Sequence, residues 1–312
     1  MSAVLRDAAS RVRRRWLALA CTITLAAGWC AIAAAAVAQV PAAGARFQII
    51  TADDSSVTRR ISDDLYKRLV PLFNQRSDPS PTRRTVLVTI GPVALRDAAA
   101  LKCDCVVIAA FTSSQVWRAV TGGLSPSRQA AMTAIYAEPS PGDQIRLISL
   151  LYRRPMRVAA IVSHDTGHLR PIMLGTGAVE IEDYAEGDDI NYALNRVGQA
   201  QVLLAMPDRT VYSTENFRNI LLSTYRHNQA VIGFSADMVR AGALATTYSN
   251  IEHINAHITE LAADFIATGE LAPPQFPRYF RTTINEGVAR SLQVAISDEA
   301  RKFGREPQVR RP

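Results

Sequence analysis

Short apolar runs alternate with amphipathic segments along most of this chain, and this alternation limits its possible folds more than any other feature. The runs of strand length cover residues 47–51, 85–90, 105–110, 131–137, 158–162, 179–182 and 200–205. The helical segments between them cover residues 56–73, 93–101, 113–120, 143–151, 188–197 and 214–227. Because strands that alternate with helices form parallel sheets with right-handed crossovers, we expect an α/β chain. Arg154 and Pro155 separate two such sets, so we expect two sheets in succession.

Residues 229–292 continue the alternation and contain two clear boundary signals. A short apolar strand, a helical turn and a second extended run are predicted at 229–235, 236–242 and 243–248. Asn250 is a typical N-cap and Gly269 a typical C-terminal stop for an amphipathic helix over residues 250–268. The order in this segment is therefore strand, helix, strand, helix.

Several residues of this segment also match the pattern of a known family. They are Ser235, Asp237, residues 242–245, Gly269, Glu270, Pro277, Ile284, Asn285, Ala289 and Leu292. The segment closely resembles the late part of ABC-transporter substrate-binding proteins of the tryptophan/tyrosine-type family. The resemblance is looser over residues 158–249 and weaker again over residues 47–154.

This resemblance implies a type I periplasmic binding-protein fold, with two doubly wound parallel-sheet α/β domains and an interdomain cleft. It implies that residues 47–154 and about 250–280 form domain one, while residues 155–249 and about 281–305 form domain two. The helix at 250–268 is then expected on domain one, and residues 282–292 are expected to return toward domain two. A chain of 274 residues (312 minus 38 for the amino-terminal segment described next) is long enough for both.

The amino terminus has the composition of an export signal. Several arginines precede an Ala-rich apolar stretch at 16–38, and Ala36-Val37-Ala38 is a small-x-small cleavage site before Gln39. We therefore expect residues 1–38 to be removed and the protein to be periplasmic. A retained membrane anchor is the alternative, because the stretch is about long enough to span a bilayer.

Removal of this segment also changes the charge of the chain. The whole chain carries a formal charge of +7, of which residues 1–38 contribute +4 (five Arg and one Asp), so +3 remains. The remaining arginines are scattered and form no basic block with interleaved aromatic residues. We therefore expect no nucleic acid as a partner.

Two cysteines remain outside the amino-terminal segment, Cys103 and Cys105. On a strand their side chains would point to opposite faces, so a bridge between them would be strained. We expect two small residues in a buried strand, with a metal or redox pair as the alternative. A metal site would need more Cys or His nearby in the sequence, and there are none.

Ligands of open parallel sheets bind beyond the carboxyl ends of the strands. The polar residues that we expect to contact a ligand there are Asp54, Ser113, Ser114, Asp208, Arg209 and Ser235. Free N–H groups at helix starts attract carboxylates, so the serines are expected at the anionic end of the ligand and Asp208 at its cationic end. The turn at 206–211 resembles the family's Pro-x-Asp-Asn-x-Val turn, with Arg209 in place of Asn. Plain helix capping is the alternative role of the Ser and Asp residues.

The sequence gives little support for catalysis, and we expect no enzyme. Ser163, His164 and Asp165 are adjacent, so they cannot converge as nucleophile, base and orienting acid. The common hydrolase, zinc-protease and phosphate-loop motifs are missing from the sequence. His253 and His257 share one helix face and could bind a metal, but no third ligand is evident, so a solvated polar face is the preferred interpretation.

The resemblance implies a periplasmic substrate-binding protein of an ABC-type importer that captures a small polar, amino-acid-like ligand between its two domains. It implies a membrane permease, or another envelope membrane protein, as the partner, with no cofactor and no metal. The chain departs from the family at residues 130–142, and at 167–174, where Pro171 and Gly175 interrupt an expected helix. The alternative is a periplasmic accessory or sensor subunit of a membrane receptor or transporter that kept the fold but lost transport-type ligand binding.

Overall fold

The computed structural model describes residues 47–74, 85–176 and 179–308. The expected signal segment at 1–38 lies outside these ranges. Within the described ranges, no helix combines the length and the apolar composition needed to cross a bilayer.

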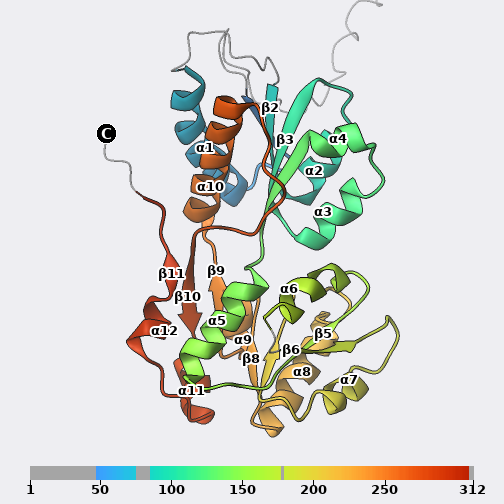
Figure 1. The fold of residues 1–312 in the computed structure, drawn as a ribbon, viewed down its shortest axis with the longest axis vertical. Helices are drawn as coiled ribbons and strands as arrows, with labels where there is room; N and C mark the ends of the chain where they lie inside the picture. Colours follow the sequence, from blue (N-terminus) through green and yellow to red (C-terminus); the bar gives the residue numbers. More distant parts are fainter. Residues whose placement is uncertain (1–46, 75–84, 177–178, 309–312) are drawn as a thin grey trace, which may run out of the picture. The chain divides into compact units, whose positions relative to one another are not determined.

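The first sheet has four parallel strands in the order β1-β2-β3-β4. Strands β2 and β3 of this sheet are labelled in Figure 1. They are β1 (Phe47–Thr51), β2 (Thr85–Ile90), β3 (Cys105–Thr112) and β4 (Met132–Tyr136). Alternate side chains of a strand point to opposite faces. Accordingly Val106 and Ile108 of β3 pack into one apolar cluster, and Val107 packs into the other.

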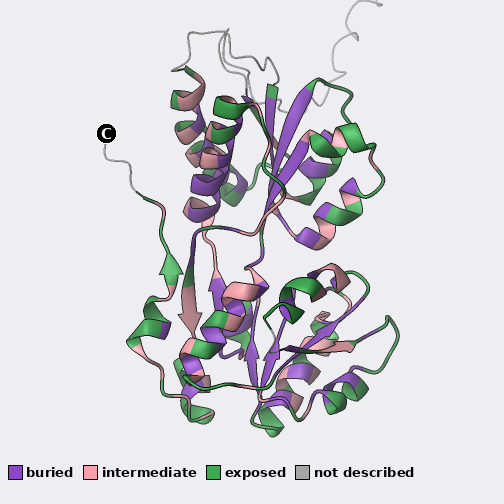
Figure 2. Ribbon diagram, viewed as in Figure 1, coloured by how far each residue is buried: buried purple, intermediate pink, exposed green. Residues whose placement is uncertain are grey.

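Helices cover both faces of this sheet. One face packs against α1 (Ser56–Asn74) and α10 (Ile251–Thr268), and the other against α2 (Gly91–Ala100) and α3 (Ser114–Thr121). The short helix α4 (Pro126–Ala130) leads into β4. Strands β2, β3 and β4 between these layers are almost wholly buried (Figure 2), which explains their continuous apolar sequence.

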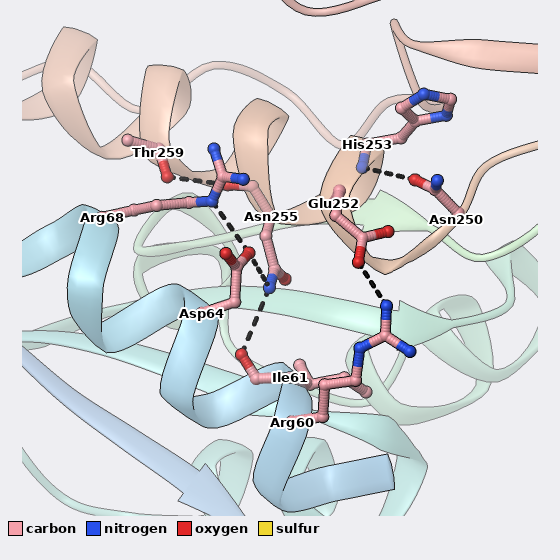
Figure 3. A network of polar contacts seen from close by, with 9 residues as sticks. All are labelled: Arg60, Ile61, Asp64, Arg68, Asn250, Glu252, His253, Asn255 and Thr259. Atoms are coloured by element: carbon pink, nitrogen blue, oxygen red, sulfur yellow. Dashed lines mark hydrogen bonds and ion pairs between the residues drawn. The ribbon is translucent and has the colours of Figure 1, made fainter.

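Helix α10 follows the sequence prediction closely at both ends. The Asn250 side chain accepts a hydrogen bond from the His253 backbone N–H at 2.8 Å, and Gly269 takes the left-handed conformation with φ of 76°. Polar contacts then join α10 to α1 (Figure 3). Asn255 Nδ2 donates to the carbonyl of Ile61 at 3.2 Å and to Asp64 Oδ2 at 2.9 Å. Two helices far apart in the sequence are thus held side by side.

The second sheet has seven strands in the order β11-β10-β9-β8-β7-β5-β6. They are β5 (Val158–Val162), β6 (Val179–Asp183), β7 (Val202–Leu204), β8 (Ala230–Ile232), β9 (Ala245–Tyr248), β10 (Phe280–Ile284) and β11 (Gly304–Arg305). Strands β5 to β9 are parallel, but β10 pairs antiparallel with both β9 and β11. At this edge the parallel sheet is therefore extended by antiparallel pairing, because the chain returns along β9 in the opposite direction.

The second sheet is also covered on both faces. One apolar cluster contains α5 (Pro141–Tyr152), α6 (Arg170–Leu174), α11 (Glu286–Ser291) and α12 (Asp298–Lys302), and the other contains α7 (Ile190–Arg196), α8 (Thr214–Arg226) and α9 (Ala236–Ala241). Alternation along β5 again divides the faces, with Ala160 on the first side and Ile161 on the second.

Residues 167–174 are not an interrupted helix, as we had expected, but two short helices in series. A 3-10 turn, η1 (Gly167–Leu169), leads directly into α6. Pro171 lies in the first turn of α6, where its missing N–H has no helical partner to lose. Proline here starts a helix, and Gly175 follows its end.

The expectation for the cysteines is wrong, because Cys103 and Cys105 form a disulfide with their Cα atoms 5.3 Å apart. Cys105 is the first residue of β3, but Cys103 lies in the exposed bend before it. Because only one of the two is on the strand, the pleat does not separate their side chains.

The expectation of a solvated face at His253 and His257 is also wrong, because both imidazoles are 1% exposed. His253 Nε2 lies 2.8 Å from Glu306 Oε2, and His257 Nδ1 accepts from the Arg278 backbone N–H at 3.2 Å. These partners come from the carboxyl-terminal part of the chain, which covers the face that the helix would otherwise expose.

Candidate functional site

A pocket of about 930 Å³ lies where the amino-terminal end of α3 approaches the segment after β5. Most of its lining comes from α2 and α3, which pack on the first sheet, and from the turns after β5 and β7 of the second sheet. The lining residues are Arg96, Ala99, Ala100, Gln115, Val116, Arg118, Ala119, Val120, Leu124, His164, Asp165, Gly167, His168 and Arg209. Its position beyond strand ends is where parallel sheets bind ligands.

Two side-chain hydrogen bonds join α3 to the segment after β5 beside this pocket. Gln115 Nε2 donates to Asp165 Oδ2 at 2.5 Å, and Ser114 Oγ lies 3.0 Å from His168 Nε2. His168 Nδ1 lies 3.1 Å from the Asp165 carbonyl, which can only accept, so Nδ1 carries the proton. In the neutral ring Nε2 is then an acceptor, and Ser114 donates to it.

Burial and a nearby positive charge keep the His168 imidazole neutral. Burial, followed by the nearby Arg118 guanidinium, lowers the pKa of His168, and its contact with the Asp165 carbonyl only partly opposes this. The group is therefore uncharged at neutral pH and holds the tautomer set by the carbonyl.

Ser114 is held in turn by a buried acid, Glu138. Glu138 Oε1 accepts from the Ser114 backbone N–H at 2.8 Å, while its Oε2 has no hydrogen-bond partner among the described residues. Burial raises the pKa of Glu138, and burial together with Glu138 raises the pKa of Tyr136 to about 12. The amino terminus of α3 is thus already capped by a side chain of the protein.

The turns after β5 and β7 are organised by Asp208, which is 1% exposed. Its Oδ2 accepts from the Ser163 N–H at 2.8 Å and from the Thr166 hydroxyl. Its Oδ1 accepts from the N–H groups of Thr210 at 3.0 Å and Val211 at 3.1 Å. Both carboxylate oxygens are therefore occupied by the protein's own donors.

The charged groups that line the pocket are mostly cationic. Arg96, Arg118 and Arg209 line it and form no ion pair with any described residue, and Asp165 is the one carboxylate in the lining. The arrangement has the chemistry to bind an anionic group by guanidinium contacts and a cationic group at Asp165.

The structure separates the six residues expected to contact a ligand. Arg209 lines the pocket, and Ser114 contacts His168 beside it. Ser113 caps α3 and Ser235 caps α9, each accepting from a backbone N–H. The last two are Asp54, an exposed residue 3.0 Å from Arg59, and Asp208, the organiser of the turns.

Sequence reasoning missed two polar residues of the pocket lining. Gln115 and Arg118 lie inside α3, beyond the strand ends where ligand contacts were expected. Arg118 is one helical turn after Ser114, and this spacing indicates that the two side chains share one face of the helix.

The run Ser163-His164-Asp165 does not converge into a catalytic arrangement. The Ser163 hydroxyl accepts from the Asp165 backbone N–H at 3.1 Å, and the His164 ring is fully exposed, 3.8 Å from Asp165. In the part of the chain that the structure describes, no group of three or more His, Cys, Asp or Glu is placed to hold a metal ion.

Comparison with protein-family models finds no match, and no curated protein sequence matches the chain. Solved structures do match. An ABC domain in complex with L-Trp from Streptococcus pneumoniae is 14% identical, with TM-score 0.50, over 81% of this chain and 97% of that one. A conserved domain protein from Vibrio cholerae is 14% identical, with TM-score 0.52, over 83% and 99%.

A third match is the ligand-free, open structure of a substrate-binding protein with adhesive properties from Clostridium difficile. It is 12% identical, with TM-score 0.58, over 82% of this chain and 97% of that one. Similarity at this level of identity concerns the fold. It agrees with the two doubly wound sheets described above, and the chain has the type I periplasmic binding-protein fold.

Proposed function

We propose that this protein is a periplasmic substrate-binding protein that captures a small polar, amino-acid-like ligand and presents it to the membrane permease of an ABC transporter. The pocket between α3 and the turns after β5 and β7 is the proposed binding site. Its role is binding without catalysis.

The observation that carries this proposal is the mixed charge of a pocket lined from both sheets. Arg118 comes from α3 beside the first sheet, while Asp165 and Arg209 follow strands of the second. A ligand with a carboxylate and an ammonium group would contact a guanidinium and a carboxylate from different sheets. Few convergent polar groups in a concave site of about 300–1,000 Å³ are typical of small-molecule sites.

We propose that the two sheets define two domains, formed by residues 47–154 with about 250–280 and by residues 155–249 with about 281–305. The packing of α10 on the first sheet and the pairing of β10 with β9 in the second support this division. Export to the periplasm would follow from removal of residues 1–38. The intact mass of the protein tests this. A periplasmic protein that begins at Gln39 supports export, whereas a membrane-bound protein that retains Met1 or Ser2 contradicts it.

The binding proposal is tested by thermal unfolding of the purified protein with a panel of amino acids and other small polar metabolites. A ligand that binds only the native state raises the unfolding temperature, by an amount set by its concentration relative to Kd. We expect at least one amino-acid-like compound to do so, and Arg118→Gln to reduce the shift.

If no member of the panel shifts the unfolding temperature and a membrane protein co-purifies instead, the accessory or sensor role replaces this one. The pocket's guanidinium groups, which form no ion pair with a described residue, favour ligand capture over that alternative.

A further inference from the structure

The charges that line the pocket narrow the class of ligand that it can bind. Three guanidinium groups and one carboxylate line it, from Arg96, Arg118, Arg209 and Asp165. The fixed charge of the lining is then +2, from three positive groups and one negative group.

The position of Arg118 on α3 places its side chain on the face of the helix that lines the pocket. Arg118 lies one helical turn after Ser114, whose hydroxyl reaches His168 at 3.0 Å, so the two side chains share a helix face. The electrostatic influence of Arg118 on the pKa of His168, second to burial, agrees with this placement. The guanidinium therefore belongs to the face of α3 that lines the pocket.

Arg209 is adjacent in sequence to a carboxylate that does not neutralise it. The Asp208 carboxylate accepts four hydrogen bonds, from Ser163, Thr166, Thr210 and Val211. The carboxylate is buried beneath the turn, while Arg209 is exposed and lines the pocket. The buried carboxylate thus shapes the turn, and Arg209 stays available to an incoming anion.

Asp165 keeps free acceptor capacity. Its Oδ2 accepts from Gln115, while the neighbour of its Oδ1 among the described residues is the His164 ring at 3.8 Å, beyond hydrogen-bond distance. A carboxylate accepts up to about four hydrogen bonds, so Asp165 has room for an ammonium donor.

We infer that the ligand is an acidic amino acid, with its ammonium group at Asp165 and its two carboxylates at guanidinium groups that include Arg118 and Arg209. This inference rests on the proposed function and narrows its ligand class. Two carboxylates and one ammonium complement three guanidinium groups and one carboxylate. A neutral amino acid would leave a desolvated guanidinium without an anionic partner, which disfavours its binding.

The test is isothermal titration of the purified protein with five named compounds. L-glutamate and L-aspartate carry all three groups, L-glutamine and L-tryptophan lack the second carboxylate, and glutarate lacks the ammonium. We expect an acidic amino acid to bind at least about tenfold more tightly than the other three compounds, or about 1.4 kcal/mol.

Variants assign the contacts. Arg118→Gln and Arg209→Gln should each weaken binding of the acidic amino acid at least tenfold, and Asp165→Asn should remove its advantage over glutarate. Arg226→Gln is the matched control, because Arg226 is also an exposed arginine in the last turn of a helix and lines no part of this pocket. It should leave the affinity unchanged.

The possible results distinguish failure of the inferred ligand class from failure of the proposed function. Equal or tighter binding of L-glutamine or L-tryptophan overturns the inference and leaves the proposed function standing. Equal binding of glutarate, or an equal loss in Arg226→Gln and Arg118→Gln, also overturns the inference. Failure of all five compounds overturns the inference, and failure of the wider metabolite panel as well overturns the proposed function.

Discussion

The backbone N–H of Ser163 donates a 2.8 Å hydrogen bond to Oδ2 of Asp208, 45 residues further along the chain. This contact joins the turn after β5 to the turn after β7, which are neighbouring strands of the second sheet. The two turns that supply Asp165 and Arg209 to the pocket are therefore held together from beneath by one buried carboxylate.

Replacement of Asp208 is expected to destabilise the fold itself. Asp208→Ala leaves four donors, including the Ser163 N–H, without their acceptor, so we expect a loss of about 2–4 kcal/mol in the free energy of unfolding. Urea unfolding measures the loss, with Arg209→Gln as the neighbouring control; an unchanged midpoint for Asp208→Ala would contradict this role.

Asn255 is expected to be a main polar link between α1 and α10. Asn255→Ala removes its hydrogen bonds to Ile61 and Asp64, within a buried contact, and should cost about 1–3 kcal/mol. Thr259→Ala on the same helix removes only a bond to the helix's own backbone and is the control. Equal unfolding midpoints for the two variants in urea would show that the link contributes little.

The buried imidazole of His257 should make stability depend on pH. Burial, followed by Arg278, lowers the pKa of His257 from its ordinary value of 6.5 to about 4. Between these values the unfolded chain binds a proton that the folded chain does not, so this group makes stability rise with pH, by at most about 1.4 kcal/mol per pH unit. Above 6.5 both states are neutral and the effect ends.

Urea unfolding of wild type and His257→Asn at several pH values between about 4 and 7 measures this contribution. The variant should show a smaller rise of unfolding free energy with pH in this window. Comparison with wild type removes the contribution of Glu138, whose raised pKa acts in the opposite direction. Parallel pH profiles would show that His257 does not titrate differently in the folded state.

The disulfide between Cys103 and Cys105 should contribute modestly to stability. It closes a loop with a sequence separation of 2, and loops this short contribute about 1–2 kcal/mol in the chain-entropy treatment. The double variant Cys103→Ser, Cys105→Ser should lose about that much, and a reducing agent should destabilise wild type but not the variant. Alkylation of both thiols in unreduced, denatured wild type would show that the bond does not form.

Much of the fold could be predicted because its signals are local. An apolar run such as β5 needs only its own residues to indicate a strand buried on both faces. Asn250 and Gly269 satisfy the backbone at the two ends of α10 through contacts within a few residues. Capping by Ser113 and Ser235 is equally local, and capping was the alternative role considered for these residues.

The sequence by itself determined the alternation of strands and helices, the main helix ends and the two-sheet α/β class, since each depends on residues close together in the chain. Tertiary structure alone decided the antiparallel pairing of β10, the burial of His253 and His257, and the use of Asp208 beneath the pocket. Each of these depends on a partner far along the chain, and a residue type does not specify which distant segment will cover it. The meeting of Gln115 with Asp165, 50 residues apart, belongs to the same class, because only folding brings α3 to the turn after β5.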